Sequence, residues 1–199
     1  MATTLDALSV ALALPAGLAV ADFVSAIAHW FGDTYFAADA PLMGSIVGPF
    51  RLHHADPDAF RRHGVFERNR NNVLAALPLL AMAAWLAPWA SAAGHPFWGA
   101  TLAAASIALA GATQIHAWAH DDDVPRLVGR LQRCGILLSR ARHARHHRNA
   151  HDRAYAIVNG WANTVLDNTA FFRRAERFAA RLGLRPVSLA PAQHARVER

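Results

Sequence analysis

Three long apolar runs limit what this 199-residue chain can fold into. They cover residues 5–28, 73–91 and 97–119, and only the first contains charged side chains, Asp6 and Asp22. Each run comes close to or exceeds the roughly 20 apolar residues that an α-helix needs to cross a bilayer. We therefore expect an all-α integral membrane protein, a helical bundle with three to four membrane helices. Buried core helices of a soluble bundle are the alternative.

The distribution of arginine predicts how these helices are oriented. All twenty basic residues are arginine, and none lies in residues 1–6 or in the connector 92–96. Five lie in residues 31–72, and the other fifteen follow His120. Because cytoplasmic loops of membrane proteins carry the excess of basic residues, both long polar segments are expected in the cytoplasm. The pattern predicts a multi-pass protein, as in a bacterial inner membrane.

The rest of the chain is amphipathic rather than apolar. Leucine alternates with arginine over residues 126–140, which is typical of helices that lie at the level of lipid headgroups. A fourth, shorter helix that dips into the membrane could form within residues 154–172. From residue 184 onward, prolines and scattered polar residues predict a disordered tail. We therefore expect one domain over 1–183 and a tail over 184–199.

Histidine is the anomalous residue type, with twelve in 199. Ten of the twelve lie on the side of the membrane predicted to be cytoplasmic, close to the ends of the apolar runs. These ten are His29, His53, His54, His63, His116, His120, His143, His146, His147 and His151. His95 lies in the outer connector and His194 in the tail, so neither is a candidate. We expect a cytoplasmic histidine-rich cap on the bundle.

The spacing of these histidines is that of metal ligands. His116 and His120 are four residues apart, so they share one face of a helix. The stripe from His143 to His151 repeats this spacing, and His53 and His54 add an adjacent pair. Neutral imidazoles suit iron, zinc and copper, and ten converging nitrogens exceed what one ion can use. The four groups together therefore predict a site for two ions, although a single pair would more often be a surface accident.

Acidic and amide side chains are candidates to support such a site. Asp22 lies on the same face of the first run as His29, and a carboxylate inside a membrane span is usually functional. We expect Asp22 to accept the N–H of a ligating histidine, with pairing to an arginine as the alternative. Asp33 and Asn72 are further candidates to bind the metal or to support a ligand.

Several other functions fit the sequence less well. One cysteine excludes a disulfide framework and a thiolate zinc site. The formal net charge of +6 would suit nucleic acid, but such a partner gives no reason for histidines at helix ends, so none is expected. A membrane metal transporter or sensor is the rival from a different class. A transporter would want polar residues in the middle of several spans, and the second and third runs offer almost none.

Four blocks of sequence, at residues 21–34, 49–63, 114–120 and 143–163, hold these histidines in a fixed order. Together they resemble the plasmanylethanolamine desaturase family, also called the Kua or lipid desaturase family, over about residues 20–165. Some positions depart from the family pattern, among them Gly64, Arg70, Ala150 and Ala156. None of these departures removes a histidine.

The resemblance implies a membrane lipid desaturase with two iron ions held by the ten histidines, one or two of which would support ligands rather than bind iron. It implies use of O₂ and of an external electron donor of the ferredoxin or cytochrome b5 type, with no catalytic side chain beyond the metal centre. We expect a phospholipid substrate, with an alkyl ether chain converted to a vinyl ether (plasmanyl to plasmenyl). The alternatives are desaturation of an ester-linked acyl chain, as on phosphatidylglycerol, and lipid hydroxylation by the same kind of centre.

Overall fold

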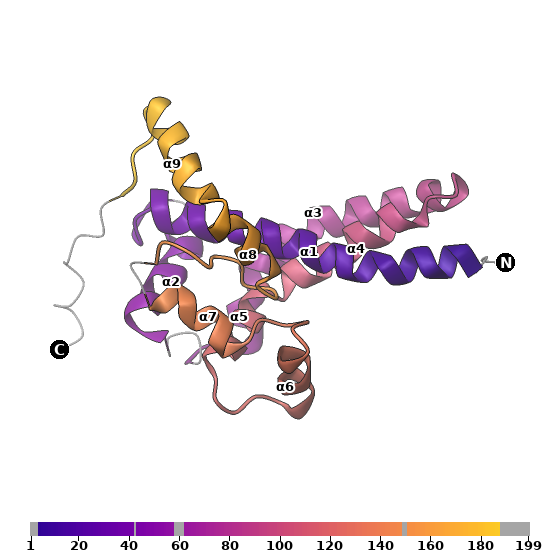
Figure 1. Cartoon of the computed structure of the whole chain (residues 1–199), viewed down its shortest axis with the longest axis horizontal. Helices are drawn as coiled ribbons and strands as arrows, with labels where there is room; N and C mark the ends of the chain where they lie inside the picture. The colour runs from indigo at the N-terminus through magenta and orange to yellow at the C-terminus, as the bar shows by residue number, and fades with distance from the viewer. Residues whose placement is uncertain (1–3, 42, 58–61, 149–150, 188–199) are drawn as a thin grey trace.

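The computed structural model describes residues 4–41, 43–57, 62–148 and 151–187, and these residues form α-helices and loops without a β-strand (Figure 1). The predicted all-α class is confirmed. The helices are α1 (Thr4–Tyr35), α2 (Gly44–Ala55), α3 (Val65–Ala92), α4 (Pro96–Ala110), α5 (Ala112–His120), α6 (Arg126–Arg133), α7 (Arg140–His147), α8 (Trp161–Asn168) and α9 (Phe171–Arg181).

The long helices α1, α3 and α4 run side by side along the long axis of the molecule, and the shorter helices gather at one end (Figure 1). Both α1 and α3 pack on α4. Within α1, Ala7–Tyr35 is long and apolar enough to cross a membrane, and so is the whole of α3. A third span results if α4 and α5, which meet at a bend of 49°, are taken together. The structure therefore supports two or three membrane helices.

Two of the expected helices differ in the structure. The third apolar run is broken at Gly111, where α4 ends and α5 begins, rather than continuing straight. Residues 154–160 are not helical, and α8 starts only after Gly160, whose φ is 77°. The shorter helix expected within 154–172 is therefore limited to the eight residues of α8 and the start of α9, and its entry into the membrane stays a prediction.

The expected tail falls mostly outside the described residues, which end at Val187. The backbone N–H of Val187 donates to the Thr34 carbonyl at 2.8 Å, so the chain contacts α1 up to this point. The division at residue 183 and the side of the membrane on which the short helices lie both stay predictions.

Small residues allow the long helices to approach closely. A Cβ added to Gly17 of α1 would lie 2.6 Å from Ala104 Cβ and 2.8 Å from the Thr101 carbonyl oxygen of α4. On the other side of α4, a Cβ on Gly99 would lie 3.1 Å from Ala87 Cα of α3. In a membrane, helices associate through such close packing because lipid chains remove the hydrophobic drive between them. The glycines therefore fix the spacing of the bundle.

We expect Gly17→Ala to lower stability by about 1–3 kcal/mol, because the new methyl group meets backbone atoms that cannot rotate away. Thermal unfolding in detergent measures the change. Gly32→Ala in the same helix is the matched control, since its Cβ would lie 3.7 Å from the nearest atom, Val47 Cγ2, an ordinary contact. Equal unfolding temperatures for the two variants would contradict the packing argument.

Candidate metal centre

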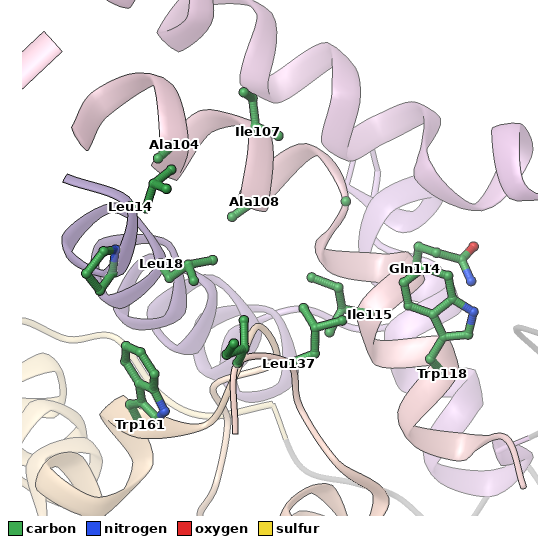
Figure 2. Close-up of a pocket in the computed structure, with 13 residues that line it drawn as sticks. Leu14, Leu18, Ala104, Ile107, Ala108, Gln114, Ile115, Trp118, Leu137 and Trp161 are labelled. Carbon is green, nitrogen blue, oxygen red and sulfur yellow. The ribbon is translucent and has the colours of Figure 1, made fainter. Parts of the chain in front are cut away.

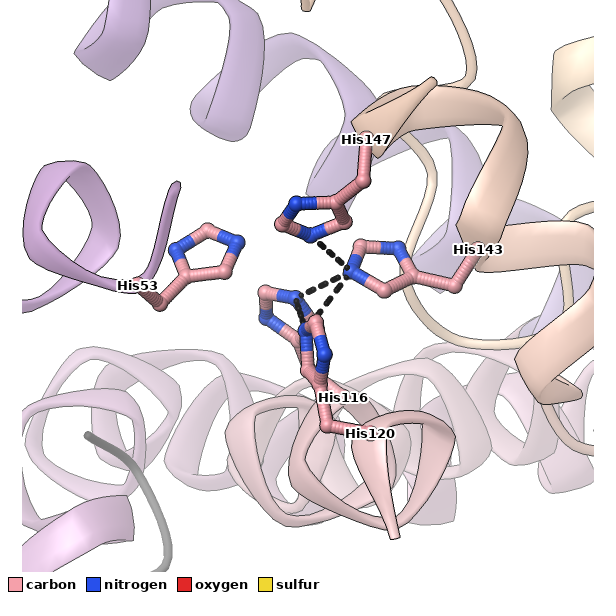
Figure 3. A group of neighbouring side chains, drawn as sticks. All are labelled: His53, His116, His120, His143 and His147. Carbon is pink, nitrogen blue, oxygen red and sulfur yellow. Dashed lines mark hydrogen bonds between the residues drawn. The ribbon is translucent and has the colours of Figure 1, made fainter. Parts of the chain in front are cut away.

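Five histidines from three helices converge at the end of the bundle. His53 comes from α2, the i, i+4 pair His116 and His120 from α5, and the pair His143 and His147 from α7. One ligand nitrogen from each lies within 4.8 Å of all the others. Figure 3 shows the rings pointing toward a common centre, with His53 facing His143 across it. The i, i+4 spacing on α5 and α7 places both rings of each pair on the inner face.

The nitrogens in this first histidine group are too close to be explained by hydrogen bonds alone. His143 Nε2 lies 2.8 Å from His116 Nε2, 2.9 Å from His120 Nε2 and 3.0 Å from His147 Nε2. A ring nitrogen carries one hydrogen or one lone pair, so it cannot satisfy three such partners. Nitrogens bound at about 2.1 Å to one ion lie roughly 3.0–3.4 Å apart at octahedral or tetrahedral angles. The arrangement therefore fits a shared cation.

A second group adjoins the first and includes a carboxylate. It consists of His29 and Asp33 from α1, His54 from α2 and His146 from α7, again with ligand atoms within 4.8 Å of one another. Asp33 Oδ2 lies 3.2 Å from His29 Nε2, 3.4 Å from His54 Nε2 and 3.7 Å from His146 Nε2. The His29 and His116 rings, one from each group, are only 5.7 Å apart between centroids. The site therefore offers two neighbouring positions for metal ions.

Burial keeps these imidazoles in the form that binds metal. Desolvation, together with the charge that neighbouring rings would carry, lowers the pKa of His53, His54, His143 and His146. Burial and the nearby His120 lower the pKa of His147 to about 3. These five rings are therefore neutral at physiological pH, with a lone pair available to a cation.

Backbone carbonyls set the orientation of three of the rings. His29 Nδ1 lies 2.9 Å from the Tyr155 carbonyl oxygen, and His146 Nδ1 lies 2.8 Å from that of Arg153. His53 Nδ1 bonds the Phe50 carbonyl in the same way. If each Nδ1–H donates, Nε2 is left for the metal, which is the usual arrangement around a ligating histidine.

The segment that supplies two of these carbonyls is held by Asp22. Its Oδ1 accepts the backbone N–H groups of Val158, Asn159 and Gly160 at 3.1, 2.8 and 2.9 Å. Its Oδ2 accepts that of Ala162 at 2.9 Å. Four charge-assisted bonds to one fully buried carboxylate fix residues 158–162 against α1.

The other residues predicted for the site lie at its edge or apart from it. The ring of His151 stacks on that of His54, with centroids 4.0 Å apart, beside the second group but not in it. His63 is exposed and pairs with Glu67 at 3.0 Å, apart from both groups. The Asn72 amide donates to the Leu109 carbonyl at 3.2 Å. Metal ligation by each of these residues stays a prediction.

The structure also places the two carboxylates predicted near the site. Asp33, expected either to bind the metal or to support a ligand, lies among the ligand atoms of the second group, one turn after His29. In the described residues the Asp22 carboxylate contacts backbone amides instead of a histidine, so it supports the rings through the chain. The i, i+4 spacing of His29 and Asp33 could have predicted that Asp33 lies beside the His29 ligand nitrogen. Apart from Gly160, residues 153–163 have no sequence feature that predicts their contact with Asp22.

Both ligand groups lie within a known protein domain. The sequence profile of the lipid desaturase domain matches residues 18–188. The chain belongs to the lipid desaturase family. It is 39% identical to the plasmanylethanolamine desaturase of Myxococcus xanthus over 162 residues, which are 81% of this chain and 57% of that protein. The mouse plasmanylethanolamine desaturase 1 is 37% identical over 84% of this chain and 64% of its own length.

A plant relative has a different name. The chloroplastic fatty acid desaturase 4 of Arabidopsis thaliana is 34% identical over 89% of this chain and 54% of its own length. This chain thus spans a little over half to about two thirds of the length of these relatives. No solved structure matches it.

We expect Asp22→Asn to destabilise the protein by about 3 kcal/mol, because an amide brings one oxygen and an N–H₂ group to four backbone donors. Thermal unfolding in detergent and the bound-metal content measure the loss. Asp167→Asn is the control, since its carboxylate accepts a single backbone N–H, from Ala154 at 3.2 Å. Its cost should stay below about 1 kcal/mol. Equal losses in the two variants would contradict the role assigned to Asp22.

Proposed function

We propose that this protein is an O₂-dependent di-iron lipid desaturase of the membrane. The observation that carries the proposal is the pair of adjoining ligand groups, mostly histidine, at one end of a bundle of apolar helices. Membership of the lipid desaturase family supports it. Removing hydrogen from an unactivated hydrocarbon chain needs an oxidant that side chains alone do not supply.

The residues of the two groups fit a pair of iron ions. When bound, such a centre supplies the oxidant that acts on the C–H bonds of the lipid. The chain itself holds nine ligand positions in place, keeps the imidazoles neutral by burial, and orients three rings through backbone carbonyls. Asp33 adds a negative charge to the second group, which offsets part of the charge of a cation there.

For the substrate, we propose an alkyl ether phospholipid that is converted to a vinyl ether. The names of the Myxococcus and mouse relatives support this choice. The name of the Arabidopsis relative supports the second candidate, an ester-linked acyl chain.

For the reductant and the location, the proposal is a multi-pass protein of a bacterial inner membrane with the site on the cytoplasmic side. Its electron donor would be an acidic protein of the ferredoxin or cytochrome b5 type. Exposed arginines at this end of the molecule, among them Arg126, Arg130 and Arg133 of α6, suit such a partner.

Two ligand groups predict about two iron ions per chain after purification from iron-supplemented cells. We expect the double variant His120→Ala/His143→Ala to lose the first ion, and His29→Ala/His146→Ala to lose the second. Elemental analysis by mass spectrometry measures both. His95→Ala is the control, because this residue lies beyond the far end of α3, and it should retain both ions. A single ion in the wild type that both double variants abolish would contradict two centres.

Lipid analysis tests the reaction directly. In a host supplied with an alkyl ether phospholipid, we expect an acid-labile product about 2 Da lighter, the mass of two hydrogens. His147→Ala should abolish this product, because it removes one ligand of the first group, and His95→Ala should not. The same mass loss on an ester-linked chain would move the substrate to the second candidate. A product about 16 Da heavier would identify a hydroxylase. No lipid change with iron and donor present would contradict the proposal.

A further inference from the structure

Two apolar cavities lie along the helices of the bundle. The larger, of about 680 Å³, lies between α1, α4, α5 and the start of α8, with Leu18, Ile115 and Trp161 among its walls (Figure 2). None of the residues that line it belongs to either ligand group. The smaller, of about 370 Å³, lies between α1, α2 and α3, and His29 of the second group forms part of its wall.

One end of the smaller cavity reaches the second ligand group and is separated from the first by one aromatic ring. His29 and Phe50 meet there, with ring centroids 5.5 Å apart. The Phe50 ring in turn stacks on His116 of the first group, with centroids 6.1 Å apart. A hydrocarbon chain seated in this cavity would therefore end against residues that contact both metal positions.

The outer end of the smaller cavity faces sideways from the bundle. Val24 of α1, Phe31 of α1 and Ile46 of α2 line it and are each more than 40% exposed. Val24 and Phe31 belong to a candidate membrane span, so this opening would face lipid rather than water. A lipid chain could enter from the bilayer without crossing the aqueous phase.

The polar side chains in the wall have their donors engaged. Asn71 donates to the Ser45 carbonyl at 3.1 Å, and Asn72 donates to the Leu109 carbonyl at 3.2 Å. These two amides tie α3 to α2 and to α4. The remaining walls are mostly alkyl or aromatic, so the cavity suits a hydrocarbon chain.

We propose that the cavity between α1, α2 and α3 holds the hydrocarbon chain of the lipid substrate, with the carbons to be desaturated at its His29–Phe50 end. This inference rests on the proposed function and adds where the chain lies. The larger cavity has no residue of either ligand group in its wall, so we do not place the reacting chain there.

Gly32 and Leu14 of α1 serve as probes for the two cavities. Gly32 lines the smaller cavity, and a Cβ there would lie 3.7 Å from its nearest neighbour, Val47 Cγ2. Its φ is not positive, so leucine fits the backbone at this position. Leu14 lines the larger cavity and is 60% exposed, so tryptophan there enlarges a side chain of that cavity far from both ligand groups.

The test uses an alkyl ether phospholipid that carries a photoreactive diazirine in its chain. It is crosslinked to the iron-loaded protein in phospholipid vesicles, and the labelled peptides are mapped by mass spectrometry. We expect labels on the walls of the smaller cavity. Gly32→Leu should lower both this labelling and the turnover of the unmodified lipid at least about tenfold with unchanged iron content, because it fills the cavity. Leu14→Trp should change neither.

The possible results separate this inference from the proposed function. Labels in the larger cavity with none in the smaller, or full turnover by Gly32→Leu, would overturn the inference and leave the desaturase proposal standing. Labels in the smaller cavity with no desaturated product would support chain binding and overturn the desaturase proposal. Ala75→Leu narrows the same cavity from α3 and replaces Gly32→Leu if that variant does not fold. The labelled positions in the wild-type protein test the inference even if neither variant folds.

Discussion

The buried carboxylate of Asp22 is the contact on which the rest of the site depends. It joins a helix near the start of the chain to the backbone of residues 158–162, more than 130 positions later. Those residues continue the segment whose carbonyls at Arg153 and Tyr155 orient one ring from α7 and one from α1. Without this anchor, each helix could still form, but the two carbonyls that orient the His29 and His146 rings would no longer be held in place. One charge inside the bundle thus organises side chains it does not touch.

The ligands on the long helices lie near one end of the candidate membrane spans. The first helix continues past the apolar run as far as Tyr35 and carries His29 and Asp33 on this extension. Helices α4 and α5 meet at a bend of 49° at Gly111, and both histidines of α5 follow the bend. Polar groups are costly in hydrocarbon, so a site at this boundary can hold charged ions and still be reached by a lipid chain.

Much of this arrangement could be predicted from the sequence, and the reasons for the rest are physical. The length of the apolar runs and the spacing of the histidines are local features of the sequence. They are enough to predict the helical class and the histidine pairs on α5 and α7. The division into two groups could not be predicted, because it depends on how α2 and α7 place neighbouring residues, such as His146 and His147, on different sides of the site. The partners of Asp22 were hidden for the same reason. Every residue except proline carries a backbone N–H, so the sequence does not indicate which of these groups bind Asp22.

The crowding of ring nitrogens has a consequence for the protein before any metal binds. Of the contacts at about 3 Å that His143 Nε2 makes, only one can be an ordinary N–H···N hydrogen bond between neutral rings, and the others bring lone pairs or hydrogens together. A chain that folds without metal keeps this repulsion, whereas a bound cation converts it into attraction, so binding free energy becomes folding free energy. Metal supply would then set how much of the chain stays folded, so a shortage of the metal would lower the amount of protein as well as the occupancy of its site.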